Sequence, residues 1–267
     1  MNIQQYYRSA AMTALNGSLA AFVPVILILG GGMIFSVQLP LFLIILPFCF
    51  YSFICYQQYL IQQQRSHEVN YIKTVNEQSF YTEDNLLITF LPAPSLRMLL
   101  FASNGNMIGE VRDKYFYWWR WFLPYFIDRL FPMEYGLYDQ AGQVMAVYRI
   151  DLRKQQVKIY DSTGGLMGVV TEDHKATPSL KRSGVIRSLE NNKLIYAERS
   201  ALYPQVFLRN EQGKIIGKLI KGWMPLEWSQ QFRDGNTPFI TFEKNLPETE
   251  KILTIAVLTE MFHYTSH

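Results

Sequence analysis

A long uncharged stretch near the start of this chain restricts its fold more than any other feature. Between Arg8 and Arg65 the sequence has 56 residues without a single Asp, Glu, Lys, Arg or His. Two apolar runs within it, roughly residues 13–35 and 39–59, are each about 20 residues long, which is the length an α-helix needs to cross a bilayer. A signal peptide followed by a buried segment is the alternative, but no small-residue cleavage site precedes the second run. The sequence therefore predicts a transmembrane hairpin within residues 1–65.

The charges beside the hairpin predict its orientation. Arg8 precedes it and Arg65 and Lys73 follow it, whereas the turn between the two runs is uncharged. Because cytoplasmic flanks are enriched in Lys and Arg, we expect an integral protein of the cell membrane with both termini in the cytoplasm. Both cysteines of the chain lie in the second run, which fits a reducing compartment for the remainder.

Four later segments repeat one pattern of strand, turn and strand. After an apolar strand, each has a Gly at the turn, a variable residue, two apolar residues and then Gly or Ala. These pairs are Gly105 with Gly109, Gly142 with Ala146, Gly164 with Gly168, and Gly213 with Gly217. The first Gly supplies the positive φ of a tight hairpin, and the second small residue leaves room for a close neighbour. Hairpins at this density predict an antiparallel sheet that closes on itself.

The last apolar segment, residues 248–264, is hydrophobic on almost every face of a helical wheel. A helix of this kind is buried in a core or in a membrane. Its apolar part has about 13 residues and includes two Thr and one Glu, so it is too short and too polar to span a bilayer. We therefore expect it to lie along the axis of the closed sheet, with two glutamates at its positive N-terminal end.

This order of hairpins, ending in an apolar helix, resembles the tubby C-terminal-like superfamily, which includes tubby, the LURP-one-related proteins and the phospholipid scramblases. The resemblance covers about residues 70–264 and is closest to the LURP-one-related branch. It rests on "YDQAGQVMAVYRI" and "VKIYDSTGGLMGVV", and on the closing pair "VFLRNEQGKIIGKLI" and "FITFEKNLPETEKILTIAVLTEMFHY".

The resemblance implies an α+β fold for residues 66–267, a closed antiparallel β-barrel of about twelve strands around the terminal helix. It also implies association with lipid headgroups in some branches and no established enzymatic activity. Neither tubby's phosphoinositide-binding basic residues nor the acidic calcium loop of the scramblases has a match in this sequence, so no site residue is carried over.

An aromatic insertion, "DKYFYWWRWFLPYFIDRLFP" at residues 113–132, interrupts the pattern of hairpins. Trp118, Trp119 and Trp121 are candidates for contact with the membrane–water interface, where large rings with a polar edge are favoured. The alternative is an insertion that packs against the wall of the barrel.

Positive charge is concentrated in residues 149–221, which hold 14 Lys or Arg against 7 Asp or Glu. Lys175, Lys181, Arg182 and Arg187 form a candidate site for anionic phospholipid headgroups, because cytoplasmic leaflets are negative. An ordinary solvated face is the alternative. Nucleic acid is a poor candidate partner, since the net charge is only +3.

The sequence offers no arrangement of residues that points to catalysis. The four His are scattered, and the cluster "TEDHK" reads as a solvated turn, so we expect neither an enzyme, a metal site nor a cofactor. The leading hypothesis is a membrane-anchored barrel that binds or senses anionic lipid. A membrane protein–protein interaction or immunity-type module, in which hairpin and barrel are docking surfaces, is the alternative. Lipid scrambling ranks last, because no charged residue lies in the two spans.

Overall fold

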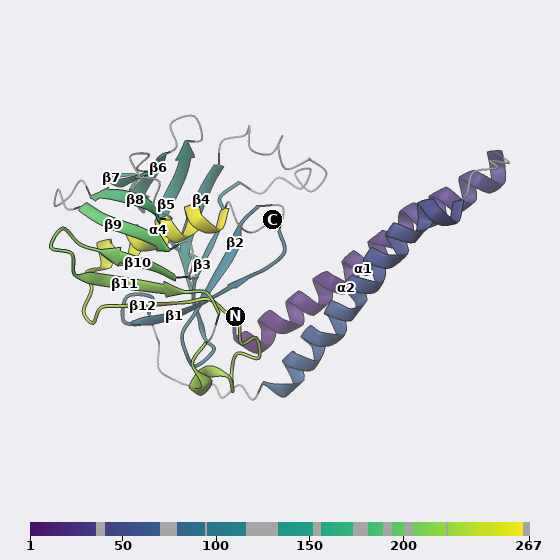
Figure 1. Ribbon diagram of the computed structural model, residues 1–267, viewed down its shortest axis with the longest axis horizontal. Helices are drawn as coiled ribbons and strands as arrows, with labels where there is room; N and C mark the ends of the chain where they lie inside the picture. Colours follow the sequence, from purple (N-terminus) through teal and green to yellow (C-terminus); the bar gives the residue numbers. More distant parts are fainter. Residues whose placement is uncertain are drawn as a thin grey trace. The chain divides into compact units, whose positions relative to one another are not determined.

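The chain forms two compact units, Met1–Ile72 and Lys73–His267. The first is a helical hairpin and the second is a β-barrel (Figure 1). The computed structural model describes residues 1–35, 41–69, 79–93, 95–115, 133–151, 156–172, 181–188, 194–200, 205–222 and 224–263.

Two long antiparallel helices, α1 (Ile3–Phe35) and α2 (Leu41–Glu68), lie side by side in the hairpin (Figure 1). Both extend beyond the predicted spans into the flanking polar residues. A 33-residue helix is about 50 Å long, against a hydrocarbon core of about 30 Å. The predicted turn between the two spans lies outside the described residues.

Hydrogen bonds at two levels tie α1 to α2. The Ser52 hydroxyl donates to the Ser18 carbonyl oxygen at 3.0 Å, and the two hydroxyls lie 2.9 Å apart. Nearer the polar ends, the Gln4 amide donates to the carbonyl oxygen of Ser66 at 3.1 Å. Both pairs fit the same antiparallel register, so the hairpin has one defined alignment.

Twelve strands close into an antiparallel barrel, in which each strand pairs with its neighbours in sequence and β1 pairs with β12. The strands are β1 (Asn85–Phe90), β2 (Arg97–Phe101), β3 (Met107–Asp113), β4 (Met133–Asp139), β5 (Val144–Asp151), β6 (Gln156–Asp161), β7 (Leu166–Glu172), β8 (Lys181–Ser188), β9 (Leu194–Ser200), β10 (Gln205–Arg209), β11 (Ile215–Ile220) and β12 (Phe239–Phe242). A short 3-10 helix, η2 (Leu226–Trp228), lies between the last two strands. The predicted closed barrel is confirmed.

The C-terminal helix α4 (Glu248–His263) fills the barrel (Figure 1). Every residue from 251 to 262 is buried, and the inward-facing side chains of the strands join the helix in one hydrophobic cluster. The Tyr148 hydroxyl donates to the Ile252 carbonyl oxygen at 3.2 Å. The rings of Phe90 and Phe262 meet edge to face, 4.9 Å apart. The sheet therefore surrounds the helix, as its apolar faces predicted.

The four repeated hairpins share one geometry. Their turn glycines, Gly105, Gly142, Gly164 and Gly213, all have positive φ, between 76° and 91°. In each hairpin the second small residue pairs with a Leu or Ile, and the register shifts by one residue between this pair and the turn. These pairs are Leu100–Gly109, Leu137–Ala146, Ile159–Gly168 and Leu208–Gly217.

Steric crowding explains the second small residue. A Cβ on Gly217 would lie 3.0 Å from Cδ1 of Leu208, and one on Gly109 would lie 3.3 Å from the Tyr138 carbonyl oxygen. Beside the β-bulge, the small residue thus makes room for the branched partner at Gly217 and for the backbone of the next strand at Gly109.

The strict up-and-down order gives the barrel two different ends. The tight-turn end carries the four repeated hairpin turns, the β8–β9 connection and the entry of α4. The long-loop end carries the other connections, among them those between β3 and β4, β5 and β6, and β7 and β8. Helix α4 runs from the tight-turn end to the long-loop end, where Phe262 meets Phe90 at the end of β1.

Candidate functional site

The helical hairpin presents an apolar outer surface. Both helices are long and apolar enough to cross a membrane, judged by length and composition. Large side chains such as Leu27, Ile34 and Phe42 are 69%, 77% and 72% exposed. Exposed apolar surface on this scale is unfavourable in water and typical of contact with lipid or with another apolar partner.

Three basic residues and one valine form a row around the outer wall of the barrel, perpendicular to the strands. Arg149 on β5 pairs with Lys158 on β6, Lys158 pairs with Val169 on β7, and Val169 pairs with Arg187 on β8. Buried residues flank Arg149 and Lys158 on both sides and precede Arg187, which is itself exposed, so the three side chains are on the solvent side. We call Arg149, Lys158 and Arg187 the basic row.

The cations of the barrel differ in whether a carboxylate accompanies them. Arg97 is 2.7 Å from Glu110, and Lys214 forms an ion pair with Glu243. Among the described residues, Lys158 and Arg187 have no carboxylate partner and no side-chain hydrogen bond. Their positive charge is therefore not neutralised by any carboxylate of the described residues.

Arg149, the first member of the basic row, is held by its neighbours. Its guanidinium lies 2.5–2.6 Å from Glu134 and 5.4 Å from the centre of the Tyr160 ring. The hydrogen bond that Arg149 donates to Glu134, followed by the attraction of the carboxylate charge, raises the pKa of Arg149 above its ordinary value. Arg149 therefore remains a cation, but part of its charge is neutralised by Glu134.

The structure describes only some of the predicted site residues. Arg187 is exposed on β8. Lys181 and Arg182 are the first residues of the same strand, and their side chains lie outside the described part. Lys175 also lies outside it. The three predicted membrane-interface residues, Trp118, Trp119 and Trp121, fall outside the described residues as well.

The strand order nevertheless relates these predictions to one another. Tyr115 and Met133, which flank the undescribed part of the aromatic insertion, are at the long-loop end of the barrel. Glu172 and Lys181, which flank residues 173–180, are at the same end. The predicted interface segment and the predicted headgroup segment are thus both attached at one end.

Sequence reasoning missed Arg149 and Lys158 as site residues. Both lie in the region of excess positive charge, but they are nine residues apart in the chain and belong to different strands. Only the register of β5 against β6 shows that they are neighbours. The alternation of apolar and basic residues in each strand indicates that these side chains face solvent. It does not reveal which strands pair.

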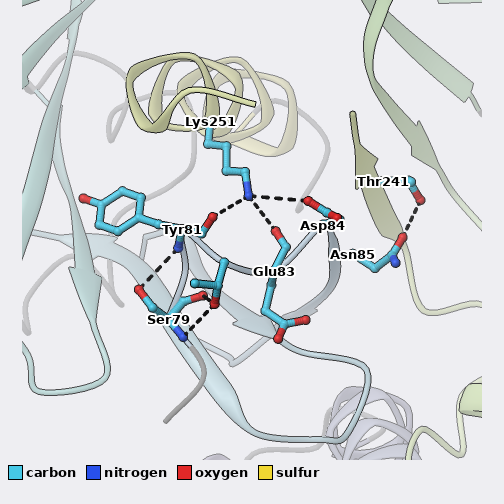
Figure 2. A network of polar contacts seen from close by, with 8 residues as sticks. Ser79, Tyr81, Glu83, Asp84, Asn85, Thr241 and Lys251 are labelled. Carbon is cyan, nitrogen blue, oxygen red and sulfur yellow. Dashed lines mark hydrogen bonds and ion pairs between the residues drawn. The ribbon is translucent and has the colours of Figure 1, made fainter. Parts of the chain in front are cut away.

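A buried lysine near the start of α4, Lys251, binds the segment that precedes β1 (Figure 2). Lys251 is 1% exposed, and its ammonium donates to the carbonyl oxygens of Tyr81 and Glu83 at 2.7 and 2.9 Å. Asp84 Oδ1 is 3.9 Å away. Burial lowers the pKa of Lys251, opposed in part by the charges of Asp84, Glu83 and Glu248. These hydrogen bonds link the start of α4 to the segment that precedes β1, and they satisfy the buried ammonium within the protein.

Within the part of the chain that the structure describes, no three His, Cys, Asp or Glu side chains gather as metal ligands would. Asp173 and His174 of the "TEDHK" cluster lie outside that part. Apart from such ligands, the described side chains include the basic row of the barrel and the apolar outer surface of the hairpin.

Comparisons with known proteins add little to this site. No protein-family model matches the chain, and no curated protein matches it. Among solved structures, the chain is similar to an X-ray structure of a protein from Arabidopsis thaliana. That match has a TM-score of 0.36 and 13% sequence identity, and it covers 68% of this chain and 94% of the other. The class that the fold defines is a closed twelve-stranded antiparallel barrel with a central helix.

Proposed function

We propose that this protein is a membrane-anchored barrel of the tubby-like kind that binds anionic lipid at the cytoplasmic leaflet and catalyses no reaction. The hairpin is the anchor in this proposal, because its outer surface is apolar. The observation that carries the proposal is the basic row, in which Lys158 and Arg187 lack carboxylate partners among the described residues.

Anchoring strengthens a weak headgroup site. Each basic residue near an anionic leaflet contributes on the order of 1 kcal/mol, so three residues alone would bind lipid weakly from solution. A barrel tethered by the hairpin meets the leaflet at a high effective concentration, and a site of this strength is then occupied. Attachment of the aromatic insertion at the long-loop end, together with the β7–β8 segment, fits an approach of that end to the membrane.

Photo-crosslinking of the full chain tests this function. A benzoylphenylalanine is placed at Val169, between Lys158 and Arg187, or at Lys218 as a control. Both positions follow the second small residue of their hairpins, Gly168 and Gly217, so they are equivalent positions on strands four apart. Each variant is reconstituted in nanodiscs of phosphatidylcholine, with or without phosphatidylserine, and crosslinked lipid is measured.

We expect position 169 to crosslink to lipid in the anionic discs and much less in the neutral discs. Crosslinking should fall at 1 M salt, where the Debye length is only about 3 Å. Equal crosslinking at 169 and 218, or in both kinds of disc, would contradict anionic lipid binding by this wall. A crosslink from 169 to a second protein in native membranes would favour the docking alternative.

A further inference from the structure

The two members of the basic row that have no carboxylate partner among the described residues flank a single strand. Lys158 and Arg187 both pair with Val169, one from each side, so their backbones are two strand spacings apart, or about 9.5 Å. Arg187 is exposed, whereas Lys158 and Val169 are half-buried. The two long side chains therefore rise from either side of a small apolar residue and can converge above it.

Two like charges in this position repel each other unless an anion joins them. Elsewhere on the barrel such repulsion is relieved by acids, as Glu134 does for Arg149 and Lys114. No carboxylate of the described residues does so for Lys158 or Arg187. Because Glu134 neutralises Arg149, the positive charge that remains in the row belongs to Lys158 and Arg187, on either side of Val169.

We propose that Lys158 and Arg187 form a clamp for one phosphate monoester group, with Val169 as its floor. This inference rests on the proposed function and specifies its ligand. A monoester carries nearly two negative charges at neutral pH, which matches the two free cations. Arginine binds two phosphate oxygens through its fork, and lysine contributes a mobile point charge. A phosphodiester or a carboxylate carries one charge and leaves one cation unmatched.

The same group occurs on a lipid headgroup and in solution, and the probes separate these sources. Full-length protein in neutral detergent micelles is titrated with phosphatidic acid, with phosphatidylserine or with inorganic phosphate, and bound molecules are counted by native mass spectrometry. The variants are Lys158→Gln and Arg187→Gln. Lys214→Gln is the control, because Lys214 is a cation in the turn between β10 and β11 that is already paired with Glu243.

We expect phosphatidic acid to bind more tightly than phosphatidylserine, and each clamp variant to weaken it about tenfold. Lys214→Gln should bind as the unchanged protein does. Equal binding of the two lipids, or equal losses in all three variants, would overturn the clamp while leaving a general attraction to anionic lipid.

The remaining outcomes concern the source of the phosphate. If inorganic phosphate binds as tightly as phosphatidic acid and is lost in both clamp variants, the clamp stands and the lipid function falls. If neither lipid nor phosphate binds, both proposals are refuted. Circular dichroism of each variant verifies that the barrel is intact.

Discussion

Replacing Lys251 with Met tests how the central helix is held in the barrel. The methionine keeps most of the lysine stem, so the loss of packing is small. It removes two hydrogen bonds from an ammonium to the carbonyl oxygens of Tyr81 and Glu83. Each such bond contributes about 1.5–3 kcal/mol, but bringing the ammonium out of water offsets part of this. We expect the free energy of unfolding to fall by about 2–4 kcal/mol.

The measurement is unfolding of the full chain in a mild detergent, followed by circular dichroism of the sheet. For a unit of this size, about 1 kcal/mol corresponds to a change of about 2–4 °C in Tm, so we expect a decrease of about 4–16 °C. Lys244→Met is the control, because Lys244 is an exposed lysine in the turn before α4. If Lys251→Met is as stable as the control, the desolvation of Lys251 offsets its hydrogen bonds, and its stabilising role is refuted.

The same variant changes how stability depends on pH. The pKa of Lys251 is lowered from 10.5 by burial, so between the lowered value and 10.5 the unfolded chain binds more protons than the folded one. Stability from this group therefore rises as the pH increases through that window and is lost as the pH falls through the folded pKa. In Lys251→Met this contribution is absent, and the difference between the two proteins should grow toward high pH.

Three further predictions concern the barrel, each measured by the same unfolding assay. Gly164→Ala should cost about 1–2 kcal/mol, because φ is +91° there although a Cβ has open space; an unchanged midpoint would contradict the strain. Leu258→Ala, at the centre of α4, should cost about 2–5 kcal/mol, and a smaller loss would show that the core can collapse onto the cavity. Tyr148→Phe should cost about 1 kcal/mol through its bond to Ile252. Because burial raises the pKa of Tyr148 well above 10.0, the unchanged protein should also lose stability above about pH 10, and Tyr148→Phe should lose less.

The sequence predicted those parts of the fold that local chemistry specifies. A turn such as Gly164 needs positive φ whatever surrounds it, so the four hairpins could be recognised before any strand was placed. The apolar faces of residues 251–262 likewise required complete burial, and the closed sheet supplies it. The ends of α1 and α2 were harder to predict, because Gln-rich flanks continue a helix without being apolar.

The candidate site was predictable only in part, since it depends on contacts between distant segments. Arg187 was identified from charge density alone. Lys158 becomes its partner only through the register of β6, β7 and β8, which a single strand does not encode. The role of Lys251 was missed for a related reason. Its acceptors are the backbone carbonyl oxygens of residues 81 and 83, and every residue has such an oxygen, so the sequence does not show which ones bind.

The order of the barrel along the chain has a consequence for biosynthesis. Its interior is filled by α4, which follows all twelve strands, and β1 cannot pair with β12 until the latter has been made. At about 5–20 residues per second, a ribosome needs roughly 10–40 seconds to pass from the first strand to the end of the helix. During that time the apolar sheet is uncovered and has two unpaired edges, and unpaired edges favour association with other chains. A stop codon shortly before α4 should therefore be as damaging as loss of the whole sheet, because the interior would stay unfilled.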